Sequence, residues 1–154
     1  MIIKQENLWE HHSPDYLCVS VGSTIWSSKL ALGPTGFAKQ VKYRYPQIEF
    51  YFAGAIKNVS RKVADNHVYS NYYIVELRRN GQNFIIFQVK KHYQDDVDME
   101  IIKESADRLN KLATERKNKS FYLSCPETSE ANQNKILEML NFLPDNVTVF
   151  VYGK

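Results

Sequence analysis

The stretch from Asp98 to Ser124, DMEIIKESADRLNKLATERKNKSFYLS, decides the fold class because it joins an amphipathic helix to a strand. Between residues 98 and 115, apolar side chains recur at helical spacing, with acidic residues at the start and basic residues just after the end, as the helix dipole favours. The apolar run at residues 121–124 then predicts a short strand. Helices that alternate with buried strands are typical of layered α/β domains.

The rest of the chain continues this alternation. Apolar runs rich in β-branched and aromatic residues predict strands, and apolar residues at helical spacing predict helices. Asn80-Gly81 is a strong signal for a tight hairpin, so the sheet is expected to be mixed rather than purely parallel. The expected strands are Tyr16–Val21, Ile48–Ile56, Val68–Leu77, Phe84–Phe87, Phe121–Ser124 and Val147–Val151, and the expected helices are Phe37–Tyr45, Asp98–Glu115 and Asn132–Leu140.

The size and charge of the chain limit its organisation and partners. Its 154 residues, 44% of them hydrophobic, suit a single domain spanning residues 1–154 with a substantial core. The formal net charge is +3, and Lys and Arg gather at residues 57–91 whereas Asp and Glu gather at residues 95–107. We interpret the two regions as solvated faces rather than as a nucleic-acid groove.

Sequence features also indicate the compartment. No apolar run approaches the length of a membrane span, and the first residues lack the features of a signal peptide, so a cytoplasmic protein without a membrane partner is expected. Cys18 and Cys125 lie in apolar, strand-like runs, which favours reduced and buried thiols. Neither the cysteines nor the adjacent His11 and His12 have the spacing of a metal site, and no cofactor is expected.

Two of the six glycines, Gly33 and Gly36, lie directly before the helix expected at residues 37–45. Glycines let the backbone approach a ligand closely, and the amides at a helix start favour a phosphate. The spacing matches neither a Walker loop nor a dinucleotide fingerprint. From these residues alone, a phosphate-binding loop and a plain turn both remain open.

Six segments carry a resemblance to a known family: NLWE, LCVSVGSTI, ALGPTGFAKQVKYRYP, VKKHYQDD, MEIIKESADRLNKLA and FYLSCPE. In this order they resemble the macro domain family, in particular its phage and bacterial branch, and the resemblance covers residues 2–151. It implies a three-layer α/β/α domain with a central mixed sheet that binds ADP-ribose or a related nucleotide. Some members of the family hydrolyse ADP-ribose-1''-phosphate or remove ADP-ribose from protein or DNA.

The resemblance also implies which residues contact the ligand. They lie beside the adenine, beside the distal ribose and in two phosphate-binding loops. In chain order they are Asn7 and Leu8 at the adenine, Gly22, Ser23 and Thr24 at the ribose, Gly33, Thr35, Gly36 and Phe37 in the first phosphate loop and its helix, and Cys125, Glu127 and Thr128 in the second loop.

The ligand loops depart from the family's pattern. Asn7 replaces an acidic residue, and Gly22 replaces an Asn that positions the ribose in the family. Pro34 and Thr35 together make the first loop one residue longer, and the second loop contains no glycine. The catalytic residues are therefore unassigned.

Other candidates for chemistry come from the residues themselves. His92 follows an expected strand and could act as a general acid or base, although packing at the strand end is the favoured interpretation. Trp26, Tyr72, Tyr73 and Tyr93 are candidates for stacking on a base, but in a chain with ten tyrosines most of them are expected to pack in the fold.

Three functions remain open. The preferred one is binding of ADP-ribose or a related nucleotide derivative, with catalysis reduced or lost, in a role against nucleotide-based or ADP-ribosylation defence. The alternative is an active ADP-ribose-1''-phosphate phosphatase or ADP-ribosyl hydrolase, in which Ser23, Thr24 or His92 would order the attacking water. The third is a protein-interaction scaffold, for instance for a host protein. The resemblance admits nucleic acid only as an ADP-ribosylated substrate, and a phage origin would place the protein in the host cytoplasm.

Overall fold

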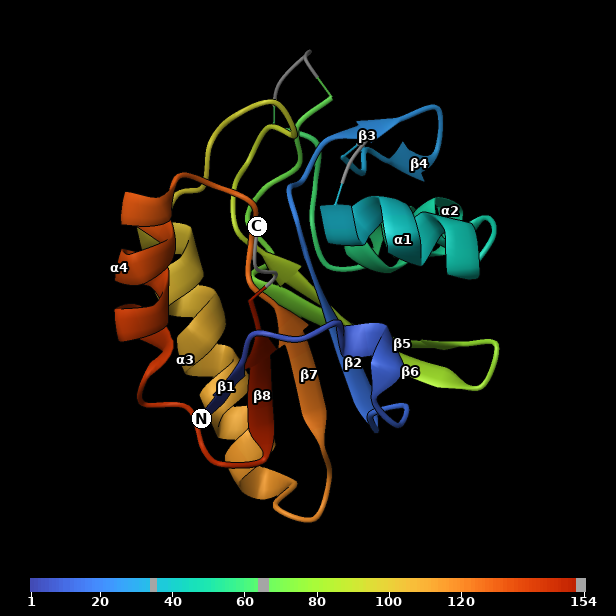
Figure 1. The fold of residues 1–154 in the computed structure, drawn as a ribbon. Helices are drawn as coiled ribbons and strands as arrows, with labels where there is room; N and C mark the ends of the chain where they lie inside the picture. The colour runs from blue at the N-terminus through green and yellow to red at the C-terminus, as the bar shows by residue number, and fades with distance from the viewer. Residues whose placement is uncertain (34–35, 64–66, 152–154) are drawn as a thin grey trace.

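The computed structural model describes residues 1–33, 36–63 and 67–151 (Figure 1). Strands and helices alternate along most of this chain. In order, the elements are β1 (Ile2–Lys4), the 3-10 helix η1 (Leu8–Glu10), β2 (Tyr16–Val21), β3 (Ile25–Trp26), β4 (Lys29–Leu30), α1 (Gly36–Arg44), α2 (Ile48–Lys57), β5 (Ile74–Arg79), β6 (Gln82–Gln88), α3 (Met99–Glu115), β7 (Phe121–Ser124), α4 (Glu130–Leu140) and β8 (Val147–Phe150).

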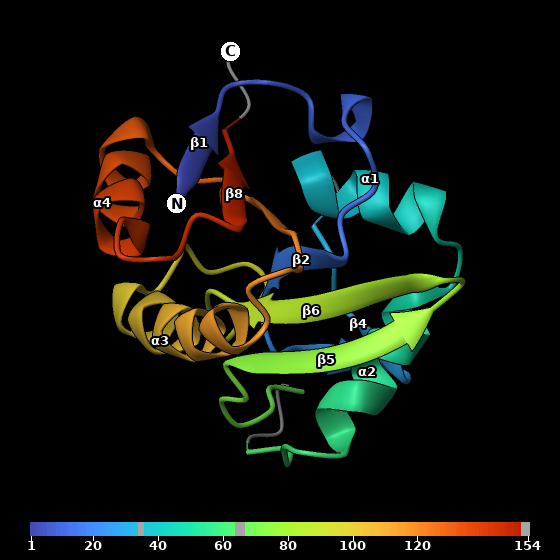
Figure 2. The same ribbon diagram turned by 90° about the horizontal axis from the view of Figure 1, so that it is seen from below.

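Helices cover both faces of a central sheet, so the domain has three layers (Figure 2). Helices α3 and α4 lie on one face, and α1 and α2 lie on the other (Figure 1). Successive side chains of β2 point to opposite faces: Leu17 and Val19 pack on the side of α1 and α2, whereas Cys18 packs on the side of α3. The predicted α/β fold with a mixed central sheet is confirmed.

Strands that are distant in the sequence pair in the sheet, whose order is β1-β8-β7-β2-β6-β5. Tyr16 of β2 lies beside Asn83 of β6 on one side and Phe121 of β7 on the other. At one edge, Ile2 of β1 lies beside Thr148 of β8. All these pairs are parallel, so the carboxyl ends of β2, β6 and β7 meet at one edge of the sheet.

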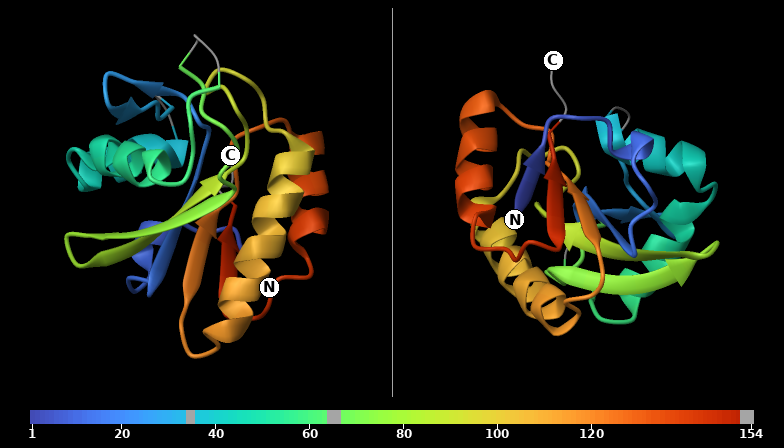
Figure 3. Two further views of the ribbon diagram at one scale, coloured as in Figure 1. Left: turned by 180° about the vertical axis from the view of Figure 1, so that it is seen from behind. Right: turned by 60° about the horizontal axis from the view of Figure 1, so that its bottom comes forward.

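The predicted hairpin at Asn80-Gly81 is confirmed. Both residues have positive φ, 52° and 77°, as a type I′ turn requires, and Arg79 pairs directly with Gln82. The hairpin makes β5 antiparallel to β6, and it projects from the body of the domain (Figure 3).

The predicted strand at Ile48–Ile56 is wrong, because this segment lies in helix α2. Its buried side chains include Ile48, Phe52, Ala53 and Ile56, which follow a helical period and pack against the sheet. The aromatic and β-branched content of the segment favours a strand locally. Burial of one helical stripe outweighs that local preference.

The predicted strand at Val68–Leu77 is correct only from Ile74 onward, where β5 begins. Tyr73 has a φ of 62°, which interrupts an extended backbone. The amides of Tyr72 and Tyr73 donate to the side-chain oxygen of Gln88 at 2.9 and 3.0 Å. The Gln88 side chain therefore replaces a strand partner at these two residues, whereas Val68 and Tyr69 form isolated bridges with Thr24 and Lys62.

The remaining predicted elements are confirmed to within a few residues. Helix α3 begins after Asp98, whose carboxylate accepts hydrogen bonds from the amides of Glu100 and Ile101 at 3.0 and 3.2 Å. The short elements β1, η1, β3 and β4 were not predicted. Both cysteines are buried, as expected, and both are free. None of the helices in the described ranges has the length and apolar character needed to span a membrane.

Candidate functional site

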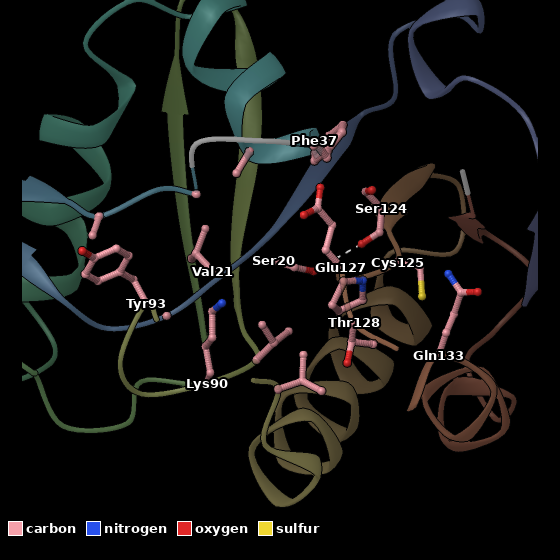
Figure 4. Close-up of a pocket in the computed structure, with 18 of the residues that line it drawn as sticks. Ser20, Val21, Phe37, Lys90, Tyr93, Ser124, Cys125, Glu127, Thr128 and Gln133 are labelled. Carbon is pink, nitrogen blue, oxygen red and sulfur yellow. Dashed lines mark hydrogen bonds between the residues drawn. The ribbon is translucent and has the colours of Figure 1, made fainter. Parts of the chain in front are cut away.

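A cleft of about 630 Å³ opens at the carboxyl ends of β2 and β7, beside the first turn of α1 (Figure 4). Ligands of open α/β sheets bind outside the carboxyl ends of the strands, and this volume is typical of small-molecule sites. The lining comes from four segments: Ser20, Val21 and Gly22 in and after β2; Ala31, Gly33, Gly36, Phe37, Ala38 and Gln40 around the start of α1; Val89, Lys90, Tyr93 and Val97 after β6; and Ser124, Cys125, Pro126, Glu127, Thr128 and Gln133 from β7 to α4.

The cleft brings together predicted ligand residues from distant parts of the sequence. Those from both phosphate loops meet across it, together with the glycine at the end of β2. They are Gly22, Gly33, Gly36, Phe37, Cys125, Glu127 and Thr128. Thr35, also predicted for the first loop, lies outside the described residues, as does Pro34.

The two residues predicted at the adenine do not line the cleft. Leu8 is buried in the core on the side of α1. Asn7 caps η1, and its side-chain oxygen accepts a hydrogen bond from the amide of Trp9 at 3.0 Å. Trp9 stacks on Phe37, with ring centroids 5.3 Å apart, and its indole donates to Gln40 at 2.6 Å. Trp9 of η1 therefore contacts two lining residues, Phe37 and Gln40.

Ser23 and Thr24 also lie outside the lining, and their hydroxyl groups contact the fold. The Ser23 hydroxyl lies 3.0 Å from the carbonyl oxygens of Tyr69 and Lys91. The Thr24 hydroxyl oxygen accepts a hydrogen bond from the amide of Tyr93 at 3.1 Å. These contacts hold the segment after β2 against two other loops.

Gly22 lines the cleft and is closely packed against another loop. A Cβ atom at this position would lie 3.0 Å from the carbonyl oxygen of Lys91, which is too close for an ordinary contact. The carbonyl oxygen of Gly22 accepts a 2.7 Å hydrogen bond from the buried hydroxyl of Tyr72. A side chain at this position would require the segment around Lys91 to shift by a few tenths of an ångström.

The first residue of α1, Gly36, contacts the second loop. Its φ of 69° favours glycine, and a Cβ atom built on it would overlap the carboxylate oxygen Oε1 of Glu127. Figure 4 shows the Glu127 side chain extending toward Phe37 at the start of α1. The second loop thus places a carboxylate at the amino-terminal end of this helix.

The polar lining residues that were not predicted include Ser20, Lys90 and Ser124. Each lies at or just after the carboxyl end of a strand, which was the signal that could have found them. The Ser20 hydroxyl donates to the carbonyl oxygen of Ser124 at 3.3 Å. Lys90 places an ammonium group in the same cleft as the backbone amides of α1 (Figure 4), so the site combines two features that attract anions.

The second loop is anchored on both sides of Glu127. The amide of Cys125 donates to the carbonyl oxygen of Phe150 at 2.8 Å, and the hydroxyl of Thr128 donates to Asp96 at 2.8 Å. The hydrogen bond from Thr128 lowers the pKa of Asp96, with a smaller effect from the backbone amide of Val97. Burial raises the pKa of the Cys125 thiol to about 11, so this thiol is protonated at neutral pH.

The other candidates for chemistry lie at the margin of the cleft or away from it. Of the aromatic candidates, Tyr93 lines it, whereas Trp26 is exposed and stacks on His67 with centroids 4.1 Å apart. His92 is not in the lining, and its Nδ1 accepts a hydrogen bond from the amide of Gln94 at 3.1 Å. His11 lies 2.6 Å from the carboxylate of Glu6. In the part of the chain that the structure describes, no group of three His, Cys, Asp or Glu residues could hold a metal ion.

The fold is that of a macrodomain. The macrodomain of Mycobacterium tuberculosis DarG is similar over 100% of this chain and 98% of its own, with a TM-score of 0.66 and 19% identity. The macrodomain of Thermus aquaticus DarG is similar over 99% of this chain and 97% of its own, with a TM-score of 0.63 and 19% identity. Thermosipho africanus DarTG in complex with ADP-ribose matches 90% of this chain and 38% of its own, with a TM-score of 0.58 and 16% identity. No protein-family model matches the sequence, and neither does any curated protein.

Proposed function

We propose that this domain belongs to the macro domain family and binds ADP-ribose or a related nucleotide derivative in the cleft, with catalysis reduced or lost. The observation that carries the proposal is the cleft itself, in which Lys90 and the amino-terminal end of α1 lie together. A cation and a helix start both favour the phosphates of such a ligand. The likeness of the fold to a protein solved in complex with ADP-ribose supports the same ligand class.

Binding is favoured over turnover by the places of the candidate catalytic groups. Ser23, Thr24 and His92, the residues expected to order a water in a hydrolase, are not among the lining residues. Cys125 lines the cleft, but its raised pKa keeps the thiol protonated and makes it a poor nucleophile. A binding module of this kind suits a role against nucleotide-based or ADP-ribosylation defence.

Calorimetric titration with ADP-ribose tests the proposal, and Lys90→Gln and Lys91→Gln make a matched pair. Lys90 lines the cleft, whereas its neighbour Lys91 is exposed and absent from the lining. We expect Lys90→Gln to weaken binding about threefold to tenfold, more at low salt, and Lys91→Gln to change it little. No heat with millimolar ADP-ribose would contradict the proposal, and release of phosphate from ADP-ribose-1''-phosphate by catalytic amounts of protein would replace it with the hydrolase alternative.

A further inference from the structure

The carboxylate of Glu127 lies where an anionic ligand would bind at the start of α1. It is so close to Gly36 that a Cβ atom there would overlap Oε1 and lie 3.3 Å from Cγ of Glu127. Helix α1 has no acidic residue in its own first turn. The amides and the positive dipole end of a helix start favour a negative charge, and Glu127 supplies that charge from another part of the chain.

A second observation in the same cleft points to a group that the described residues do not supply. Ser124 is only 2% exposed and lines the cleft, yet its hydroxyl has no hydrogen-bond partner among the described residues. Ser20, its neighbour, donates to the Ser124 carbonyl oxygen rather than to this hydroxyl. A buried hydroxyl without a partner is unfavourable, so a ligand that offers it an acceptor gains affinity.

Glu127 can leave the helix start without rearrangement of its loop. The residue is exposed, and the backbone around it is held by the amide bond of Cys125 to Phe150 and by the hydroxyl bond of Thr128 to Asp96. Movement of the Glu127 carboxylate away from Gly36 is therefore expected to come from rotation about its side-chain bonds and not from displacement of this anchored backbone. Such rotamer changes of exposed side chains are fast.

We propose that Glu127 is an internal competitor that sets how well the cleft accepts anions. Its carboxylate occupies the anion position at the start of α1, and a phosphate group enters only when the carboxylate leaves. The bound phosphate then accepts hydrogen bonds from the amides at the start of α1. The Ser124 hydroxyl gains a ligand oxygen as its acceptor. This inference rests on the proposed function, and it makes Glu127 a specificity-determining residue that disfavours ligands more strongly as their negative charge increases.

The test compares Glu127→Gln with Glu130→Gln, which removes the same charge from an exposed position outside the cleft lining. Calorimetry with ADP-ribose is paired with thermal unfolding in the presence of inorganic pyrophosphate, a probe that needs no nucleotide. We expect Glu127→Gln to bind ADP-ribose roughly tenfold more tightly than wild type and to gain more thermal stability from pyrophosphate, and Glu130→Gln to behave like wild type. Adding Ser124→Ala to Glu127→Gln is expected to reverse part of the gain.

The outcomes separate this inference from the proposed function. If wild type binds ADP-ribose and Glu127→Gln binds it equally or less tightly, Glu127 is not a competitor, and the proposed function stands. If no variant binds ADP-ribose but pyrophosphate stabilises Glu127→Gln more than wild type and Glu130→Gln, the competitor role stands, and the proposed ligand is wrong. No binding of ADP-ribose by any of the three proteins, together with equal responses to pyrophosphate, would overturn both.

Discussion

The buried hydroxyl of Tyr72 donates a 2.7 Å hydrogen bond to the carbonyl oxygen of Gly22, at the end of the central strand β2. Burial raises the pKa of this hydroxyl well above its ordinary value, so it remains a donor throughout the physiological range. The bond joins the irregular segment before β5 to a residue of the cleft. It therefore links the shape of the cleft to a residue that does not line it.

Replacing Tyr72 with Phe should destabilise the fold. The carbonyl oxygen of Gly22 would lose its buried donor, and we expect the free energy of unfolding to fall by about 1–3 kcal/mol. Urea denaturation measures the change. Tyr43→Phe is the control, because Tyr43 is 86% exposed, and a loss of similar size in both variants would contradict the role of the bond.

Two glycine-to-alanine changes should have opposite effects on stability. Gly36→Ala places a Cβ atom at a φ of 69° and against Glu127, so it should cost about 1–2 kcal/mol for the backbone alone and displace the carboxylate. Gly54→Ala lies in α2 with nothing within 4 Å of the new Cβ atom, and should stabilise the protein by about 0.5–1 kcal/mol. Thermal or urea unfolding of the two variants checks the signs, and a Gly36→Ala variant as stable as wild type would contradict the positive φ at this position.

The contact between Asp96 and Thr128 should make stability depend on acid pH. The pKa of Asp96 is lowered from its ordinary 3.8 when the protein is folded, so the carboxylate form favours the folded state. This contribution is fully present above about pH 4 and is lost as the pH falls through the lowered pKa. Asp96→Asn should therefore lose less free energy of unfolding than wild type when the pH falls below 4. The control is the exposed neighbour Asp95→Asn, which should follow wild type. Identical dependence of stability on acid pH in Asp96→Asn and wild type would rule this out.

Cys125 should resist alkylation although it lines the cleft. Burial raises its pKa to about 11, and the reactive species is the thiolate. With iodoacetamide at pH 7.5, we expect slow labelling of the folded protein and fast labelling of both cysteines in denaturant, as followed by mass spectrometry. Rapid labelling of Cys125 in the folded protein would mean that the thiol is more acidic and more accessible than the structure indicates.

Helices with strong periodicity could be predicted from the sequence, and α3 is the clearest case. It carries its own cap at Asp98 and one continuous apolar face, so local signals agree with the final packing. The segment Ile48–Ile56 gave the opposite result, because its local composition favours a strand while burial against the sheet makes it helical. Such conflicts are settled by tertiary contacts, which a single segment does not contain.

The cleft could be predicted only in outline, for a related reason. The glycines at the start of α1 suggested a phosphate-binding loop or a plain turn, and the loop after β7 was predicted only through the resemblance to the macro domain family; residues of both line the cleft. Whether a hydroxyl group lines the cleft or bonds to the backbone of another segment depends on which strands and loops pack beside it. Ser20 and Ser23 are three residues apart, yet Ser20 lines the cleft and Ser23 contacts two carbonyl oxygens of other loops.

The pairing order of the sheet also has a consequence for how the protein is made. The central strand β2 leaves the ribosome well before its partners β6 and β7, and β1 precedes its partner β8 by almost the whole described chain. The sheet therefore cannot form during most of translation, and its apolar strands remain unpaired until their partners are synthesised. We expect the domain to fold late and slowly and to depend on chaperones when synthesis is fast, because its contacts are mostly distant in the sequence.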